Sequence, residues 1–233
     1  MDNVNLEEIE IFLNEKTYLA SGKEGKVYRL NDEVVKIFYD ETNSSFERLD
    51  DNRLRLLASL ELKAFNNING FVEKCVNGQK IIVGCKERYL EHEDFQIEHI
   101  YSGDKRYNLF ASLDDIKDDI KLLSSNGFII LEIENDYFYK NGKLSFSDMT
   151  SYMQEDVNSK EYKDLLKRNY RVVSLFLIGL LIYNGHKDKN GLEDDMIISV
   201  NKYYEKNCKD RYFGDVLKEM CSIEKDYRIT KKV

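Results

Sequence analysis

Two closely spaced glycines near the start of the chain could form a turn that binds phosphate. Gly22 and Gly25 lie in the segment LASGKEGKVYRL, residues 19–30, which is typical of two strands joined by a turn. Glycine lets the backbone approach a phosphate closely, and backbone N–H groups can line an anion site. When the two glycines are considered alone, an ordinary β-turn is the better interpretation.

A lysine on the following strand strengthens the case for an anion site. Lys36 is flanked by apolar residues in the segment VVKIF, residues 34–38. Its ammonium group must therefore point inward or across a sheet face, which costs desolvation free energy unless an anion neutralises the charge. The segment predicts an anion next to Lys36.

A second group of candidate residues lies in the middle of the chain. Asn135 and Asp148 are thirteen residues apart, and a short apolar segment (137–139) and a turn (140–143) separate them. This pattern predicts two short strands joined by a turn, with an amide and a carboxylate at the two ends.

The composition of the chain excludes several classes of function. The chain has 233 residues and 27.5 kDa, which suits one large domain or two small lobes. Its net charge of −8 argues against nucleic-acid binding, and no apolar run is long enough for a membrane span. The four cysteines lack zinc-site spacing. We expect a cytoplasmic protein, and the absence of proline and tryptophan indicates an AT-rich bacterial or phage genome.

The elements that must position these residues change character near residue 90. Strands are expected at 17–20, 26–30, 33–39, 70–76 and 80–86, with one helix at 46–65 between the third and the fourth. Helices dominate afterwards, at 113–125, 161–184, 194–208 and 212–221. The expected division is a β-rich lobe at 1–90 and a helical lobe at 91–233.

The order of these motifs resembles the protein-kinase-like superfamily over residues 15–185. The segments that carry the resemblance are LASGKEGKVYRL, VVKIF and NDYFYKNGKLSFSDM. They are most similar to small bacterial or phage kinase-like proteins with a degenerate catalytic loop. The resemblance implies an α+β, bilobal protein-kinase-like fold, with an antiparallel five-stranded N-lobe that carries one helix and a mostly helical C-lobe.

The resemblance also implies ATP and Mg²⁺ as cofactors and assigns a role to each candidate. Lys36 would hold the phosphates, and Asn135 and Asp148 would bind Mg²⁺. The remaining expected nucleotide-binding residues come from the glycine hairpin and from a hinge that would meet the adenine. They are Gly22, Gly25, Val27, Glu87 and Tyr89.

The chain departs from the family pattern at positions that matter for catalysis. Ile130 stands where the catalytic aspartate of His-Arg-Asp is expected, and Ala20 replaces the first glycine of the loop. The acidic partner of Lys36 on the expected helix has no clear match: Glu47, Asp50 and Asp51 are candidates, but Arg53 lies close to the expected place. The segment after Asp148 lacks Ala-Pro-Glu.

Two carboxylates near Ile130 are candidates for the missing base. Glu132 and Glu134 alternate with apolar residues and would share one face of an extended loop. Because phosphoryl transfer depends mainly on positioning and charge neutralisation, a displaced carboxylate would support slow turnover. Solvated charges are the alternative interpretation of both residues.

The functional hypothesis is a kinase-like protein that binds ATP–Mg²⁺, with weak or atypical phosphotransfer to a protein Ser or Thr. One alternative is a catalytically inactive pseudokinase that acts as a partner-binding regulatory module. Another is a small-molecule phosphotransferase. The expected partner is a protein substrate or a regulated protein, and neither nucleic acid nor a membrane.

Overall fold

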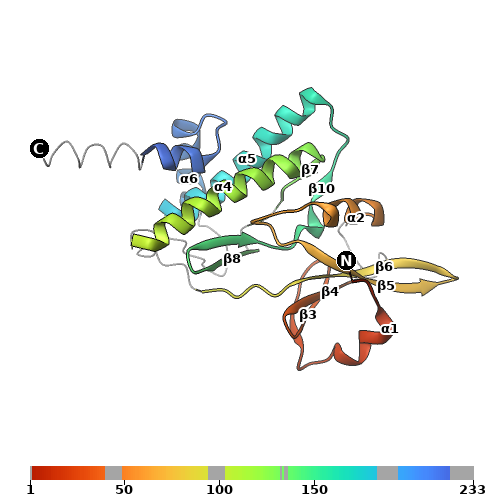
Figure 1. Ribbon diagram of the computed structural model, residues 1–233. Helices are drawn as coiled ribbons and strands as arrows, with labels where there is room; N and C mark the ends of the chain where they lie inside the picture. The colour runs from red at the N-terminus through yellow and green to blue at the C-terminus, as the bar shows by residue number, and fades with distance from the viewer. Residues whose placement is uncertain are drawn as a thin grey trace, which may run out of the picture.

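The structure is a computed structural model in which residues 2–39, 49–93, 103–131, 133, 136–182 and 194–220 are described. A β-rich part and a helical part lie side by side, joined by the segment that follows strand β6 (Figure 1). The predicted α+β composition is confirmed. The boundary at residue 90 remains a prediction.

The main sheet has the strand order β1–β5–β6–β4–β3–β2, and only the β1–β5 pair is parallel. The Asn77-Gly78 turn between β5 and β6 has positive φ at both residues, as the sequence predicts for a tight hairpin. The strands are β1 (Val4–Asn5), β2 (Tyr18–Ser21), β3 (Gly25–Leu30), β4 (Glu33–Phe38), β5 (Ile68–Val76) and β6 (Gln79–Arg88).

The sheet therefore has six strands instead of the five expected. The additional strand, β1, is held along β5 by the side chain of Asn3. Its Oδ1 accepts from the Phe71 N–H at 3.1 Å, and its Nδ2 donates to Glu73 at 2.9 Å. A two-residue strand has no hydrophobic alternation, so the sequence leaves a short helix and a lead-in strand as equal alternatives for residues 4–16. Helix α1 (Leu6–Ile9) and a 3-10 turn (Glu10–Phe12) follow it.

The helix expected at 46–65 is shorter in the described residues. Helix α2 runs over Asp51–Ser59, and the Asp50 carboxylate caps it by accepting the N–H groups of Asn52 and Arg53. Residues 40–48 lie outside the described part.

A carboxylate from the helical part explains why the chain is not helical beyond residue 60. Asp119 accepts the backbone N–H groups of Lys63, Ala64 and Phe65 at 2.9, 2.7 and 3.0 Å. These N–H groups would otherwise serve a helix, so the apolar residues of this loop enter the core from an extended backbone.

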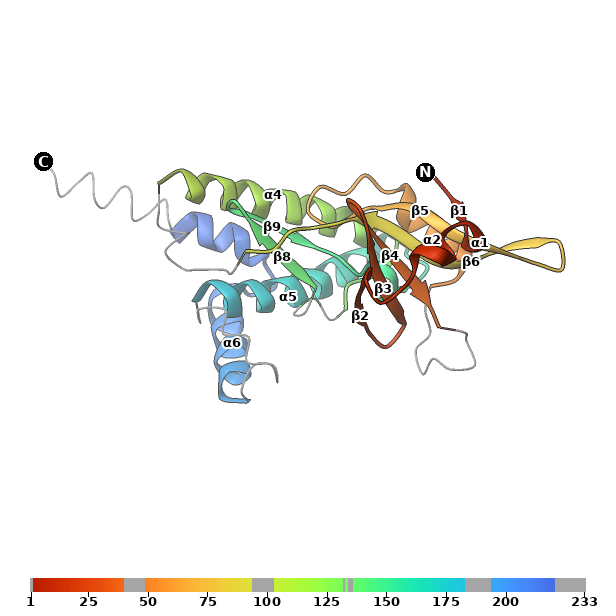
Figure 2. The same ribbon diagram turned by 90° about the horizontal axis from the view of Figure 1, so that it is seen from below.

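Two long helices organise the rest of the molecule. Helix α4 (Gly103–Ser125) and helix α5 (Ser159–Ile182) pack against each other, and a small hairpin formed by β8 (Tyr137–Lys140) and β9 (Lys143–Phe146) contacts both helices (Figure 2). Strands β7 (Phe128–Ile129) and β10 (Met153–Gln154) form a second pair, and a 3-10 turn (Met149–Ser151) precedes β10. Helix α6 (Asp194–Asn207) and helical residues 213–220 follow.

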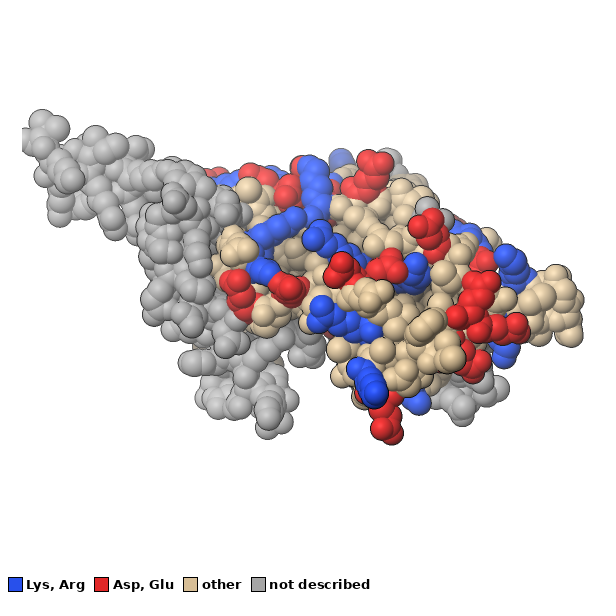
Figure 3. Space-filling model, turned by 60° about the horizontal axis from the view of Figure 1, so that its bottom comes forward, with Lys and Arg blue, Asp and Glu red and all other residues tan. Residues whose placement is uncertain are grey.

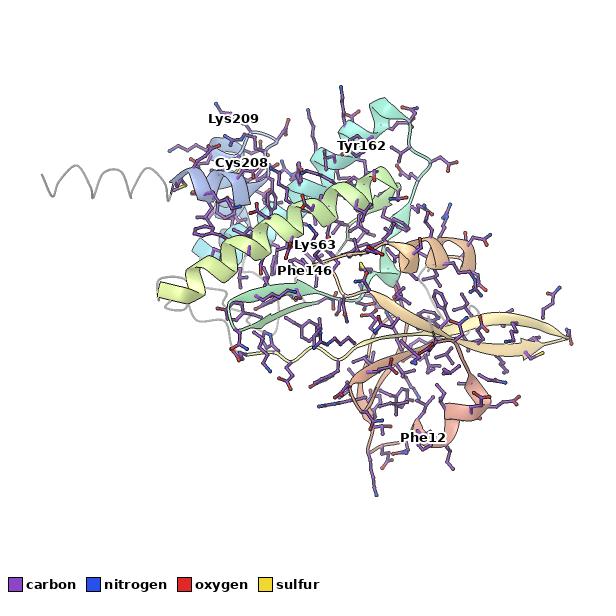
Figure 4. The ribbon with its side chains drawn as sticks, viewed as in Figure 1. Phe12, Lys63, Phe146, Tyr162, Cys208 and Lys209 are labelled. Carbon is purple, nitrogen blue, oxygen red and sulfur yellow. The ribbon has the colours of Figure 1, made fainter. Side chains whose placement is uncertain are left out.

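Phe146 lies at the centre of the core, below α4 (Figure 4). Its ring centroid is 4.9 Å from that of Phe65 and 5.5 Å from that of Phe176 on α5. The Phe146 N–H donates to the Ala64 carbonyl at 2.9 Å. These contacts fix the end of β9, two residues before Asp148.

None of the described helices is long and apolar enough to cross a membrane. Of the four cysteines, Cys75, Cys85 and Cys208 are free thiols, and Cys221 lies outside the described residues.

Candidate functional site

Lys36 lies in the interior of the main sheet, on β4 between β3 and β6. Its strand partners are Val27 and Cys85, and directly paired residues project to the same sheet face. Only 8% of Lys36 is exposed. The sequence therefore placed the lysine correctly as an inward-facing charge that needs an anion.

Three acceptors surround the ammonium group of Lys36. Its Nζ donates to Glu24 Oε2 at 2.6 Å, to Thr150 Oγ1 at 2.9 Å and to the Asp148 carboxylate. The Thr150 hydroxyl also lies 2.7 Å from Glu24 Oε2 and 3.0 Å from Asp148 Oδ1, so its single proton serves one of the two. We call Glu24, Lys36, Asp148 and Thr150 the lysine network.

The network keeps Lys36 charged. Burial by itself would lower the pKa of Lys36, but the negative charges of Asp148 and Glu24 outweigh it and raise the pKa above its ordinary value. The ammonium form is thus maintained at every pH at which the protein is expected to work.

Asp148 reaches Lys36 through a left-handed backbone conformation. Its φ and ψ are 58° and 45°, a region that Asp tolerates better than most residues other than glycine. The chain turns there from β9 into the 3-10 helix, and Ser151 Oγ donates to the Asp148 carbonyl at 3.2 Å. The fold thus brings Lys36 and Asp148, which are 112 residues apart, into direct contact.

Glu24 is the acidic partner that sequence analysis did not identify. It lies between the two glycines, and its side chain is 7% exposed. Of the helix candidates, Asp50 caps α2 and Asp51 accepts the Ile82 N–H, while Glu47 lies outside the described residues. The sequence did indicate that Lys36 needs an anion. It did not identify Glu24, because a glutamate in a loop is normally expected to be a solvated charge.

Gly25 is needed for the hairpin to lie against β4. A Cβ at this position would meet the Ile37 carbonyl oxygen at 2.1 Å. The Gly22 N–H donates to the Gly25 carbonyl at 3.0 Å, which closes the turn around Glu24. Gly22 and Gly25 thus shape a tight loop whose enclosed side chain is an acid.

The position expected for the catalytic aspartate is part of the core. Ile130 is fully buried, and its N–H donates to Asn169 Oδ1 at 2.9 Å. Asn169, on α5, in turn donates to the Phe128 carbonyl at 2.8 Å and to Ser124 Oγ at 2.9 Å. A single buried amide therefore fixes the loop backbone, a role that sequence analysis missed within an apolar helix.

Asn169→Ala is expected to destabilise the protein by about 2–4 kcal/mol, because it leaves the buried N–H of Ile130 and carbonyl of Phe128 without this partner. Urea denaturation followed by circular dichroism measures the change. Asn207→Ala removes an exposed bond to the Tyr203 carbonyl and should change stability by less than about 0.5 kcal/mol. Equal effects of the two substitutions would contradict the anchoring role of Asn169.

The remaining expected residues of the catalytic loop, Glu132, Glu134 and Asn135, lie outside the described residues. Among the residues that are described, no group of three His, Cys, Asp or Glu side chains is arranged to hold a metal ion. Asp148, with 37% of its side chain exposed, is the expected metal residue whose position is known.

At the expected hinge, Glu87 is still part of β6 and its side chain is buried. It pairs with Val34, so it projects to the same sheet face as Lys36. Asn66 Nδ2 donates to Glu87 Oε2 at 3.1 Å and to the Arg88 carbonyl at 2.8 Å. The Tyr89 N–H donates to the Asp32 carbonyl at 2.8 Å, and Arg29 stacks on the Tyr89 ring.

The environment of Glu87 favours its neutral form. Burial raises its pKa to about 8, and the nearby charge of Asp148 adds to the shift. The site thus contains a carboxyl group that is protonated near neutral pH, which the sequence gave no reason to expect.

Comparison with known proteins supports a kinase-like fold. No protein-family model matches the chain, and no curated protein matches it in sequence. Among solved structures, the chain is similar to the apo structure of a pseudokinase, with a TM-score of 0.51 and 12% identity over 95% of this chain and 97% of that chain. At this identity the likeness shows the fold: the chain has a kinase-like fold.

Proposed function

We propose that the chain is a regulatory module of the pseudokinase type, which binds ATP–Mg²⁺ through Lys36 and Asp148 but does not transfer the phosphoryl group by the usual base-assisted route. The observation that carries the proposal is the catalytic-loop position Ile130. A buried aliphatic side chain cannot accept a proton from a substrate hydroxyl, and its backbone is bound to Asn169.

The chemistry of the lysine network supports nucleotide binding. Lys36 is a buried, permanently charged cation, as a phosphate site requires, and Asp148 is a partly exposed carboxylate beside it. Carboxylate and amide oxygens are the ligands that Mg²⁺ prefers, so Asp148 and Asn135 would hold the ion. Bound Mg²⁺ would neutralise the phosphate charge. Gly22, Gly25 and Val27 would line the phosphates, with Glu87 and Tyr89 near the base.

The expected partner is a protein in the cytoplasm of a bacterium or in a phage-infected cell. Acidic and basic side chains are intermixed on the face shown in Figure 3, and the net charge is −8. Neither feature provides the positively charged surface that binding to the phosphate backbone of a nucleic acid requires, so we propose a protein as the regulated partner.

Incubation with ATP labelled at the γ-phosphate tests the proposal. The wild type should transfer no more label, to itself or to a generic protein or small-molecule acceptor, than Asp148→Asn does. ATP–Mg²⁺ should nevertheless raise the melting temperature of the wild type more than that of Asp148→Asn.

Label transfer by the wild type well above that of Asp148→Asn would instead favour the phosphotransferase hypothesis. Glu132→Gln and Glu134→Gln would then show which carboxylate acts as the base, and the nature of the labelled acceptor would separate a protein Ser/Thr kinase from a small-molecule phosphotransferase. No stabilisation by ATP–Mg²⁺ would refute the nucleotide site.

A further inference from the structure

The glycine hairpin carries a glutamate where a phosphate would be expected to bind. Glu24 is enclosed by the turn between Gly22 and Gly25, and its carbonyl accepts the Tyr39 N–H at 2.8 Å. Its carboxylate is directed at Lys36, with Oε2 at 2.6 Å from Nζ. The hairpin thus delivers an anion of this chain to the lysine.

Lys36 has no hydrogen left for a phosphate in this arrangement. An ammonium group has three N–H donors, and Nζ has three acceptors: Glu24, Asp148 and Thr150. A polyphosphate must therefore displace one of them before it can bind Lys36.

Glu24 is the acceptor that a polyphosphate would displace. Thr150 is neutral and fully buried, and the backbone of Asp148 is held in a left-handed conformation by the turn after β9. Glu24 is negatively charged and would repel a phosphate at close range. It also leaves Oε1 buried without a hydrogen-bond partner among the described residues, so its inward position carries a free-energy cost.

We infer that Glu24 is an internal substitute for phosphate, so that the glycine hairpin must release Lys36 before a nucleoside triphosphate can bind. This inference rests on the proposed nucleotide site and adds its regulation. The affinity for ATP–Mg²⁺ is then limited by the free energy needed to expel Glu24, and any partner that draws the hairpin outward raises that affinity.

Isothermal titration of ATP–Mg²⁺ into the wild type, Glu24→Gln and Glu24→Ala tests the inference. Both variants should bind at least tenfold more tightly than the wild type, because the competing charge is removed. Glu33→Gln is the matched control, since Glu33 pairs with Lys86 through side chains on the opposite sheet face from Lys36 and should bind as the wild type does.

Hydrogen exchange gives a second readout on the unmodified protein. Saturating ATP–Mg²⁺ should speed exchange of the Tyr39 amide, which donates to the Glu24 carbonyl in the closed hairpin. If ATP binds while this amide stays protected, the hairpin does not open and the inference is overturned.

The titration separates the displacement of Glu24 from the existence of the nucleotide site. If the wild type binds ATP–Mg²⁺ and neither Glu24 variant binds more tightly, Glu24 is no competitor and the nucleotide site stands. If neither the wild type nor the Glu24 variants bind, both the nucleotide site and the internal substitute are refuted.

Discussion

Lys36→Met is expected to lower the free energy of unfolding at pH 7 by about 3–5 kcal/mol. The substitution leaves Glu24 and Asp148 facing each other without the cation that both contact. Glu24 is 7% exposed, so water cannot take over the role of the ammonium group. Urea denaturation at pH 7 measures the loss.

The double variant Lys36→Met/Glu24→Gln shows whether the loss comes from the uncompensated charge. It should recover about half of the lost stability or more, because the neutral amide removes one buried negative charge. Lys86→Met is the matched control. Lys86 has a similarly buried side chain on the neighbouring strand, but its partner Glu33 is 40% exposed, so we expect a change of about 1 kcal/mol or less. Similar losses for Lys36→Met and Lys86→Met would contradict the special role of the lysine network.

The stability of the wild type is expected to fall as pH rises from about 5 to about 9, and Glu87→Gln should remove most of this fall. The pKa of Glu87 is raised from 4.5 to about 8, so between these values the folded state holds a proton that the unfolded state has released. The free energy of unfolding therefore decreases as pH increases. The shift corresponds to on the order of 5 kcal/mol.

Urea denaturation at one-unit pH intervals measures this dependence in the wild type, Glu87→Gln and Glu33→Gln. Glu87→Gln should be more stable than the wild type at pH 9 and keep the Asn66 hydrogen bond to its side-chain oxygen. Glu33→Gln should retain the wild-type slope. Parallel curves for the wild type and Glu87→Gln would show that Glu87 ionises normally in the folded protein.

The sequence contained enough information to place Lys36 and Asp148. A lysine within an apolar strand requires an anion, and the hairpin between residues 137 and 146 places Asp148 at a fixed distance from the core residue Phe146. The pairing of β5 with β6 also followed from a local signal, because the Asn77-Gly78 turn joins two strands that are consecutive in the chain.

The partners of the lysine could not be predicted because they depend on how the hairpin folds back. Whether Glu24 points inward or into solvent is decided by the approach of Gly25 to Ile37, a contact that no local pattern encodes. Thr150 is an ordinary polar residue in sequence and becomes significant only through the turn at Asp148.

Long-range polar contacts also decided two features that the sequence did not reveal. The apolar residues at 60–65 have helical spacing, but Asp119 takes the N–H groups that would continue the helix. Asn169 lies within the helix expected at 161–184, and its function becomes visible only once Ile130 and Phe128 lie beside it. Such contacts form between segments that are distant in sequence.

A crystal structure of the nucleotide-free protein near pH 7 tests the central claim most directly, through the neighbours of Lys36 Nζ. The prediction is that Glu24 and Asp148 both lie within hydrogen-bond distance of Nζ and that Ile130 is buried against the loop held by Asn169. A structure in which Glu24 points into solvent and Lys36 pairs with an acid from residues 40–51 would contradict it.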